Sequence, residues 1–396
     1  MGYLDTCAEI VKKIFNHFPL QKTIVFEANP PFCDNTWPVY RYLVEKKHID
    51  RDFKIIWLTE NYHTDGHLIP PGNEFVRLMN YGKKNNTYRD KIYFSYLMNT
   101  SVGLVYCNRI LGLNRPDQYS IMLQHGMPLK ASNGGYCIHD NCTECLCVSE
   151  FFSEYQQNDF DISREKQLFG GFPRNDYLFT KENIRKKMGI EGYKKVIVWL
   201  PTYRKSNVAS MHGFDIEITE TGIPTINTVE EIERLDSFLR ENNMLVLFKA
   251  HPVQPVDSSI ADTLTNFKVI SNDTLSEFGV QLYELLGQTD ALITDYSSVY
   301  YDYLLTEKPI GLTIDDIDDY INARGFVYDD PFEILKGEKV LDNDGLIIFM
   351  EHIRDGVDEH RDERLAVKEK IHTIKESGST EFVAERIYAE IMKRIK

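Results

Sequence analysis

The sequence predicts an α/β protein with a parallel β-sheet in each of two halves. Short, almost continuously apolar segments alternate with amphipathic ones, which is the pattern of parallel strands covered by helices on both faces. The alternation restarts after a turn rich in glycine and proline at 170–176. A chain of 396 residues is also longer than one ordinary core requires, so two domains are expected.

The composition argues against several classes of protein. Hydrophobic residues make up 42% and charged residues 27% of the chain, as in globular rather than disordered proteins. A net charge of −15 argues against a general nucleic-acid binder. No run approaches the roughly 20 apolar residues of a membrane span, and the first residues do not have the pattern of a secretion signal. Seven cysteines without such a signal indicate reduced thiols in a cytoplasmic protein.

The first half begins with an amphipathic helix, expected over 5–18 because its apolar residues recur at helical spacing. The apolar segments expected to form strands are 23–27, 53–58, 102–106 and 120–123. Helices are expected after residue 35 and over 85–100, and the stretch 60–75, with its prolines and glycines, is expected to be a loop.

His125 stands directly after the strand 120–123, at the edge where open α/β sheets bind ligands. The neighbouring Gly126 would let the backbone approach a ligand closely. The alternative is a turn histidine without a chemical role, and position alone does not decide between the two.

A group of potential metal ligands follows, namely Cys137, His139, Cys142, Cys145 and Cys147. Their Cys-x-x-Cys-x-Cys spacing is compatible with zinc. The last two cysteines also fall in a segment with the pattern of a buried strand, where free cysteines are common. A structural zinc site normally takes two separated ligand pairs and no second pair follows, so the buried strand is favoured over the metal site.

The second half repeats the alternation. The expected strands are 196–200, 245–248, 269–270, 291–294 and 308–312. Helices are expected over 181–188, 229–241 and 279–287, and 205–228 has the composition of a mobile loop. The acidic run 315–319 is read as a solvated loop in preference to a metal site. The tail from 345 has the pattern of two or three charged amphipathic helices.

Three strands of this half end in polar residues that are expected to lie side by side, because the carboxyl ends of parallel strands share one edge. These residues are Thr202 and Arg204, Lys249 and His251, and Asp295, Ser297 and Ser298. A helix that begins at the two serines would offer backbone N–H groups and its positive end to a diphosphate. Each group has an ordinary alternative, namely a surface ion pair, a core histidine and a helix N-cap.

These motifs together resemble the CDP-glycerol glycerophosphotransferases of teichoic-acid and related polymer synthesis. The resemblance covers roughly residues 120–330. The residues that carry it are His125-Gly126-Met127-Pro128-Leu129-Lys130, Gly171-Phe172-Pro173-Arg174-Asn175-Asp176, Pro201-Thr202-Tyr203-Arg204, His251-Pro252, Thr294-Asp295-Tyr296-Ser297-Ser298 with Asp302 and Lys308-Pro309-Ile310, and Arg324-Gly325-Phe326.

The resemblance implies a GT-B-like fold, in which two Rossmann-type domains face each other across a cleft. We expect an N-terminal acceptor-side domain over 1–175 and a C-terminal CDP-donor-binding domain over 176–360. The C-terminal helices, 361–396, are expected to pack back on the N-terminal domain.

The resemblance also implies a reaction, in which an acceptor hydroxyl attacks the β-phosphorus of a CDP-alditol, in the first place CDP-glycerol, and CMP leaves. Such transfer needs mainly positioning and charge stabilisation, so no cofactor and no metal site are expected, while a role for a divalent ion stays open. The expected catalytic residues are His125, the base, with His251 and Arg204. The expected donor-binding residues are Thr202, Lys249, Asp295, Ser297, Ser298 and Asp302. The expected acceptor or cleft residues are Gly126, Lys130, Arg174, Asp176 and Arg324.

The expected partners are a CDP-alditol and a cell-wall or capsular polymer or its lipid-linked primer, without nucleic acid. A cytoplasmic protein is expected, able to contact the inner face of the cell membrane through a weak basic and aromatic surface formed by Lys83, Lys84, Arg89, Lys91, Tyr93 and Tyr96. A GT-B glycosyltransferase with a nucleotide-sugar donor and a non-catalytic nucleotide- or polymer-binding protein stay open as alternatives. The sequence does not decide between glycerol and ribitol, primase and polymerase, or oligomeric states.

Overall fold

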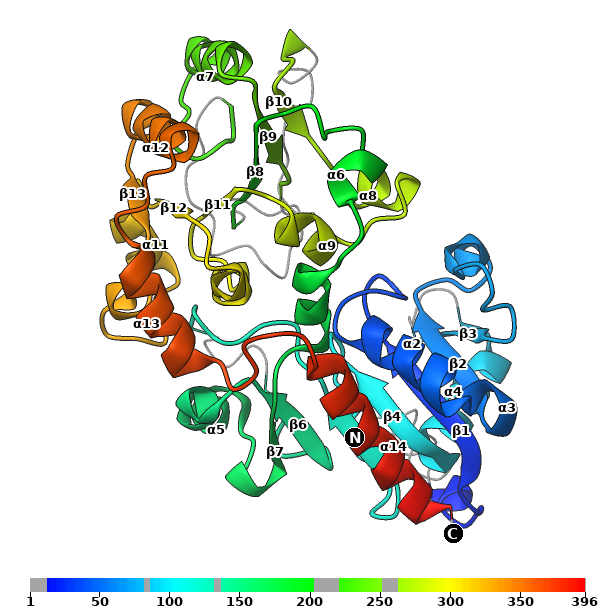
Figure 1. The fold of residues 1–396 in the computed structure, drawn as a ribbon. Helices are drawn as coiled ribbons and strands as arrows, with labels where there is room; N and C mark the ends of the chain where they lie inside the picture. The colour runs from blue at the N-terminus through cyan, green and yellow to red at the C-terminus, as the bar shows by residue number, and fades with distance from the viewer. Residues whose placement is uncertain (1–12, 82–85, 132–136, 203–220, 251–262, 396) are drawn as a thin grey trace. The chain divides into compact units, whose positions relative to one another are not determined.

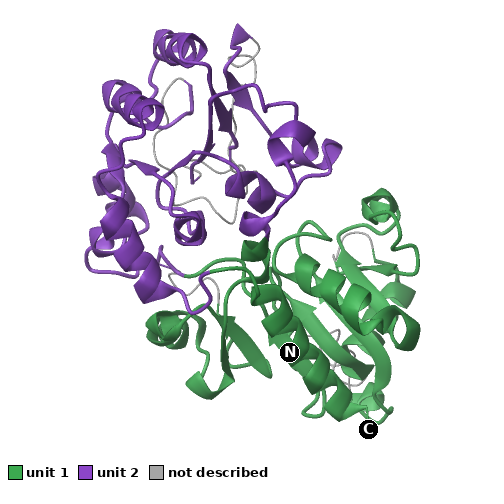
Figure 2. Cartoon of the chain, in the orientation of Figure 1, with its two compact units in different colours: residues 1–127, 136–176, 376–396 green, residues 128–135, 177–375 purple. Residues whose placement is uncertain are grey.

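The computed structural model describes residues 13–81, 86–131, 137–202, 221–250 and 263–395 (Figure 1). The chain divides into two compact units (Figure 2). Unit 1 comprises 1–127, 136–176 and 376–396, and unit 2 comprises 128–135 and 177–375.

The sheet of unit 1 has seven strands in the order β3-β2-β1-β4-β5-β6-β7, and all neighbours run parallel. The strands are β1 (Gln21–Glu27), β2 (Lys54–Thr59), β3 (Arg77–Asn80), β4 (Ser101–Tyr106), β5 (Tyr119–Met122), β6 (Glu144–Cys147) and β7 (Gln167–Phe169). The chain builds outward from β1 in one direction and then in the other, so the strand order reverses between β1 and β4. A ligand of an open α/β sheet binds beyond the carboxyl ends of the strands at such a point.

Helices cover both faces of this sheet. They include α2 (Thr36–Lys47), α3 (Ile49–Asp52), α4 (Tyr88–Thr100), α5 (Ser153–Phe160) and α14 (Ser379–Arg394). Leu97 of α4 shares one hydrophobic core with Val25 of β1, whereas α14 packs beside α2 and against β4 and β5 (Figure 1). Glycine lets α14 approach the strands, because a Cβ on Gly103 would lie 2.7 Å from the side chain of Ile391.

The sheet of unit 2 has six strands in the order β10-β9-β8-β11-β12-β13, again all parallel. They are β8 (Lys195–Leu200), β9 (Met244–Phe248), β10 (Phe267–Val269), β11 (Ala291–Thr294), β12 (Ile310–Thr313) and β13 (Glu338–Val340). The order reverses between β8 and β11, so the carboxyl ends of these two strands mark the corresponding ligand edge.

The helices of unit 2 include α6 (Ile184–Lys187), α7 (Val229–Glu241), α8 (Asn272–Glu277), α9 (Leu282–Gly287), α10 (Val299–Tyr303), α11 (Ile317–Ala323), α12 (Asn343–Asp355) and α13 (Arg361–Ile371). Leu235 of α7 and Phe349 of α12 share a core with Trp199 of β8 and Ile293 of β11. The helix α7 begins with a capping box in which Thr228 and Glu231 each bond the other's backbone N–H. Among the described residues, no helix combines the length and apolar character needed to cross a membrane.

The predicted pair of parallel sheets is confirmed, with some differences in detail. Of the expected helix 279–287, only the second part is helical, as α9. A separate helix, α8, ends at Glu277, and a turn joins the two. The expected helix 181–188 is shortened to α6, and a 3₁₀ helix, η4 (Pro173–Phe179), occupies the turn before it. The expected helix 5–18 and the loop 205–228 lie largely outside the described residues.

The division into units differs in two places from the expected domains 1–175, 176–360 and 361–396. The segment 128–135 belongs with unit 2, although it lies far inside the first expected domain. Of the C-terminal helices, α13 belongs with unit 2 and α14 with unit 1, so the tail is divided between the two units near residue 375.

Candidate functional site

The carboxyl edge of the unit 1 sheet is organised by Glu27, the last residue of β1. Its side chain is fully buried, and its Oε2 accepts hydrogen bonds from the backbone N–H groups of Cys107, Asn108 and Arg109 at 3.2, 3.0 and 3.0 Å. Burial raises the pKa of the Glu27 carboxyl above its ordinary value, against the lowering effect of these N–H groups. One carboxyl group therefore fixes the loop that follows β4.

His125 lies in the turn after β5, next to this loop. Leu123 continues the ladder by donating its N–H to Tyr106, and Gln124 then takes a left-handed backbone conformation with φ 61°. The exposed ring of His125 places Nδ1 3.4 Å from the carbonyl oxygen of Cys107. The predicted base thus stands at the ligand edge of the sheet, beside the loop that Glu27 fixes.

Arg174 binds the backbone of the same turn through its side chain. Its buried guanidinium donates to Asp34 Oδ1 at 2.6 Å and to the carbonyl oxygen of His125 at 2.9 Å. The backbone N–H of Arg174 donates to Asn35 Oδ1, and Asn35 Nδ2 donates to the carbonyl oxygen of Gln124 at 2.8 Å. Arg174 therefore helps to hold the backbone around His125 in place.

Asp176 caps the last helix of the chain. Its carboxylate accepts hydrogen bonds from the backbone N–H groups of Gly378, Ser379 and Thr380 at 3.0, 3.0 and 2.8 Å. A carboxylate at this position satisfies the N–H groups that a helix start leaves unpaired. In this structure Asp176 therefore caps a helix of unit 1.

The segment that carries Lys130 pairs with the segment that carries Arg324. Lys130 and Phe326 form an isolated antiparallel bridge, Ala131 donates its N–H to Gly325, and Val327 donates to Leu129. Two motifs that stand about 200 residues apart in the chain are thereby joined within unit 2. Gly126, partly exposed, precedes this segment and belongs with unit 1.

At the ligand edge of unit 2, Asp295 bonds to Thr202. The backbone N–H of Thr202 lies 2.9 and 2.8 Å from the two carboxylate oxygens of Asp295, and the Thr202 hydroxyl donates to Oδ1 at 2.7 Å. Both side chains are buried. The pair ties the ends of β8 and β11 together at the point where the strand order reverses.

Ser297 and Ser298, both partly exposed, lie at the start of α10. The first helical bonds run from Tyr300 to Ser297 and from Tyr301 to Ser298. Asp302, by contrast, is buried inside the helix and accepts a hydrogen bond from the hydroxyl of Tyr283 at 2.6 Å. Only the two serines of this motif therefore lie at the surface of the site.

Lys249 follows β9 and is partly buried, and this burial lowers the pKa of its ammonium group. Its backbone N–H donates to Trp199, which fixes the position where the chain leaves the sheet. Arg204 and His251, the other two expected cations of this edge, lie outside the described residues. The structure therefore brings Thr202, Asp295, Lys249 and the serines to one edge and leaves those two cations undescribed.

The cysteine cluster divides into buried and surface groups. Cys142, Cys145 and Cys147 are buried, and burial raises the pKa of the Cys142 and Cys147 thiols to about 12. The predicted buried strand is confirmed as β6, which ends at Cys147. Cys137 and His139 lie on the surface instead.

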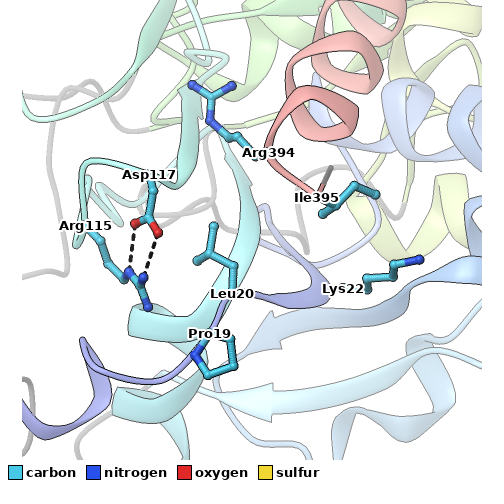
Figure 3. Close-up of a pocket in the computed structure, with 7 residues that line it drawn as sticks. All are labelled: Pro19, Leu20, Lys22, Arg115, Asp117, Arg394 and Ile395. Carbon is cyan, nitrogen blue, oxygen red and sulfur yellow. Dashed lines mark hydrogen bonds and ion pairs between the residues drawn. The ribbon is translucent and has the colours of Figure 1, made fainter.

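Figure 3 shows a pocket at the opposite edge of the unit 1 sheet, where β1 begins. It is lined by Pro19, Leu20, Lys22, Arg115, Asp117, Arg394 and Ile395. Arg115 there bonds both carboxylate oxygens of Asp117, at 2.8 and 2.6 Å. This pocket is at the amino ends of the strands, so it is separate from the edge that carries His125.

Sequence reasoning gave no supporting role to Glu27, Asp34, Asn35 or Cys107. Glu27 carries a signal of its own, since it is a charged residue at the end of an otherwise apolar strand. The others acquire their role from partners that lie 80 to 140 positions away in the chain.

Comparison with known proteins gives a consistent result. A family model described as CDP-Glycerol:Poly(glycerophosphate) glycerophosphotransferase matches residues 10–389. The chain is 26% identical to teichoic acid ribitol-phosphate polymerase TarK of Staphylococcus aureus, over 84% of this chain and 63% of that protein. It is also 26% identical to teichoic acid glycerol-phosphate transferase of the same organism, over 95% of each chain.

The structure of the wall teichoic acid polymerase TagF matches with a TM-score of 0.72 at 20% identity, over 98% of this chain and 95% of that chain. Together with the two parallel sheets, this likeness confirms the predicted GT-B-like α/β class. The chain spans 63%, 32% and 58% of the length of TarK and two further ribitol-phosphate polymerases that it matches.

Proposed function

The chain belongs to the CDP-glycerol:poly(glycerophosphate) glycerophosphotransferase family, and we propose that it transfers an alditol phosphate from a CDP-alditol to a polymer hydroxyl. Glycerol phosphate is the first candidate for the transferred group. The acceptor is a cell-wall or capsular polymer or its lipid-linked primer, and CMP is released.

The observation that carries this proposal is the way unit 1 holds His125. Arg174 and Asn35 bind the carbonyl groups of the turn, and the loop fixed by Glu27 presents the Cys107 carbonyl to Nδ1 at 3.4 Å. With a proton on Nδ1 directed at that carbonyl, Nε2 is the nitrogen that carries the lone pair, and it is assigned the proton of the substrate hydroxyl. A neutral histidine so oriented is suited to act as a general base near neutral pH.

In the proposed step, the acceptor hydroxyl gives its proton to Nε2 of His125 as its oxygen forms a bond to the β-phosphorus of the donor. The bond from this phosphorus to the bridging oxygen breaks, and CMP leaves with that oxygen. The developing negative charge is stabilised by cations and backbone N–H groups of the donor side.

Donor binding is assigned to the carboxyl edge of unit 2. Ser297 and Ser298 offer hydroxyl and backbone N–H groups to the diphosphate, and Lys249 offers a positive charge. A bound phosphate would favour the charged form of Lys249, which burial disfavours. Arg204 and His251 belong to this proposal on the sequence motifs alone.

The remaining predicted residues have supporting parts in the proposal. Thr202, Asp295 and Asp302 fix the backbone from which the donor is bound. Gly126, Lys130 and Arg324 are assigned to the acceptor side, together with the frame residues Arg174 and Asp176.

The test is release of CMP from CDP-glycerol and, separately, from CDP-ribitol, with and without a teichoic-acid primer as acceptor. We expect His125→Ala to remove most of the turnover while the dissociation constant of CDP-glycerol changes little, because the base contacts the acceptor hydroxyl. A matched control is His360→Asn, an exposed histidine paired with Glu363, which should retain full turnover.

Turnover of His125→Ala within a few-fold of the unchanged protein would show that another group takes the proton. Release of a nucleoside diphosphate from a nucleotide-sugar, with no CMP from either CDP-alditol, would identify a glycosyltransferase. Binding of CDP-glycerol without CMP release under any acceptor would identify a non-catalytic binding protein.

Contact with the inner face of the cell membrane belongs to the same proposal. Of the surface predicted for this contact, Arg89 and Lys91 are exposed on α4, Tyr93 and Tyr96 are partly buried, and Lys83 and Lys84 lie outside the described residues. Tyr88, 81% exposed, and Ile92 are further exposed residues of α4. Basic and amphipathic aromatic residues on one helix favour an anionic lipid surface. We expect Arg89→Glu with Lys91→Glu to reduce co-sedimentation with phosphatidylglycerol vesicles, and equal sedimentation of both proteins would remove α4 from the proposal.

A further inference from the structure

A cysteine, a histidine and an aspartate meet on the surface of unit 1, away from the groups used above. Cys137 and His139 precede β6, and Asp161 follows α5. Two backbone hydrogen bonds join these segments, from Ile138 to Phe160 at 2.9 Å and from Asp140 to Asp161 at 2.6 Å. The three side chains are therefore brought together by main-chain pairing rather than by their own attraction.

The three potential ligand atoms lie close enough to one another to share one metal ion. Cys137 Sγ lies 3.2 Å from His139 Nδ1, and the same nitrogen lies 3.3 Å from Asp161 Oδ2. All three atoms lie within 4.8 Å of one another. A tetrahedral zinc ion, with bonds of about 2.3 Å to sulfur and about 2.0 Å to nitrogen and oxygen, sets its ligand atoms about 3.3–3.6 Å apart.

A hydrogen-bonded relay from cysteine to histidine to aspartate describes this arrangement less well than a metal site does. In a relay, a histidine bonds one partner through each of its two ring nitrogens. Here both partners approach the same nitrogen, Nδ1, whose single proton or lone pair the two would have to share. A shared cation would satisfy the thiolate, the imidazole and the carboxylate together.

The backbone supports the arrangement. His139 and Asp161 both take the left-handed conformation, with φ of 52° and 53°, which is uncommon for residues other than glycine. Between them in the structure, Asp140 bonds the N–H and hydroxyl of Ser163 and pairs with Lys166 at 3.0 Å. Asp140 thus braces the loop and leaves Asp161 as the carboxylate of the cluster.

We propose that Cys137, His139 and Asp161 bind one divalent transition-metal ion of the Zn²⁺ class, with water in the remaining position. The side chains of His139 and Asp161 are 75% and 66% exposed, so a water ligand has access. One thiolate and one imidazole favour Zn²⁺ over Mg²⁺ or Ca²⁺, which prefer oxygen ligands. Cys142, Cys145 and Cys147, which share the sequence cluster, are buried and are not part of the proposed site.

The experiment uses the full chain, stripped with a chelator and kept reduced, and titrates it with Zn²⁺ alone and with Co²⁺ alone. We expect one equivalent of either ion, and a thiolate-to-cobalt charge-transfer band that Cys137→Ser abolishes. The variants His139→Asn and Asp161→Asn keep the left-handed backbone accessible, since asparagine tolerates it. Each should weaken Zn²⁺ binding at least about tenfold, the lower range for changes around a metal site.

Controls keep the result interpretable. His360→Asn and Cys33→Ser alter another exposed histidine and another partly exposed cysteine, and both should bind Zn²⁺ as the unchanged chain does. Circular dichroism establishes that each variant is folded. The proposal is overturned if the chain binds no Zn²⁺ at micromolar concentration, or if Cys137→Ser and Asp161→Asn bind it with unchanged affinity. These readouts do not depend on transferase activity.

Discussion

The ligand edges of the two sheets are held in different ways. In unit 1, buried charged groups bind the main chain of distant segments, as when Arg174 bonds the His125 carbonyl and Glu27 bonds the loop after β4. In unit 2, Asp295 bonds the residue that follows the neighbouring strand, and the partly exposed Ser297 and Ser298 stand beside it. In unit 1, buried charged side chains hold the backbone around the exposed His125. In unit 2, one hydrogen-bonded pair joins two neighbouring strands, and partly exposed polar groups lie next to it.

The comparison shows that a polar residue of a sequence motif need not contact a ligand, since it can instead be buried and support the backbone. Arg174, Asp295 and Asp302 are buried and bonded to the chain, while His125 and the two serines are at least partly exposed. Changes in the first group should act mainly on stability and through it on activity. Changes in the second group should act on catalysis or binding alone.

The largest effect on stability is expected from Arg174→Met, which keeps the stem of the side chain and removes its charge. It leaves Asp34 and the His125 carbonyl without their partner, and breaking such a buried pair costs about 3 kcal/mol. Urea denaturation measures the loss, and CMP release should fall with it. Arg41→Met removes one partner of the exposed pair with Glu45, so it should cost no more than about 0.5 kcal/mol. Equal losses of unfolding free energy in the two variants would show that Arg174 does not stabilise the edge that carries His125.

Asp295→Asn should cost about 1–3 kcal/mol, because one of the two oxygens that accept from Thr202 is replaced by an amide nitrogen, which cannot accept a hydrogen bond. The exposed Asp329→Asn is the control and should leave the free energy of unfolding unchanged. A loss of CDP-glycerol affinity in Asp295→Asn with no change in stability would indicate direct contact with the donor instead.

Glu27→Gln tests the frame through its pH dependence. The folded protein raises the Glu27 pKa above its ordinary value of 4.5, so the folded state binds more protons than the unfolded state between the two pKa values. The stability that Glu27 contributes is therefore fully present below the unfolded pKa and is lost as pH rises through the folded pKa. As pH rises through this range, the unfolding free energy of the unchanged protein should therefore fall relative to that of Glu27→Gln. A difference that stays constant with pH would contradict the assignment.

The smallest effect on stability is expected from Ser298→Ala, within about 0.5 kcal/mol, because the side chain is partly exposed and makes no cap hydrogen bond. If the serine binds the diphosphate, the dissociation constant of CDP-glycerol should rise about five- to tenfold, the equivalent of one hydrogen bond. Calorimetry compares it with Ser276→Ala, an exposed serine on α8. Unchanged affinity would move the donor away from the start of α10.

The sequence predicted the central strands well, because both faces of a parallel sheet are covered and its strands are continuously apolar. It missed β3 and β13, which lie at the sheet edges and are only partly buried, so that their residues do not form an apolar run. Its placement of His125, Thr202, Lys249, Asp295 and the two serines at the carboxyl edges agrees with the structure, because that position follows from strand direction alone.

The supporting contacts could not be predicted in the same way. Asp34 meets Arg174 across 140 positions, and Cys137 with His139 meets Asp161 only because two loops pair through their backbones. No periodicity or spacing encodes such pairs, since they depend on the finished packing of the unit. The favoured buried strand is confirmed for Cys145 and Cys147, although a buried strand and a ligand pair share one spacing and differ only in their packing.

The return of α14 to unit 1 sets an order of events during synthesis. Ile391 and Phe382 pack against Gly103 and Gly170, yet they leave the ribosome after all of unit 2. Until then, part of one apolar face of the first sheet lacks its cover, so the part of the protein that is translated first is completed last. A nascent chain halted before residue 379 should therefore depend on chaperones more strongly than the finished one.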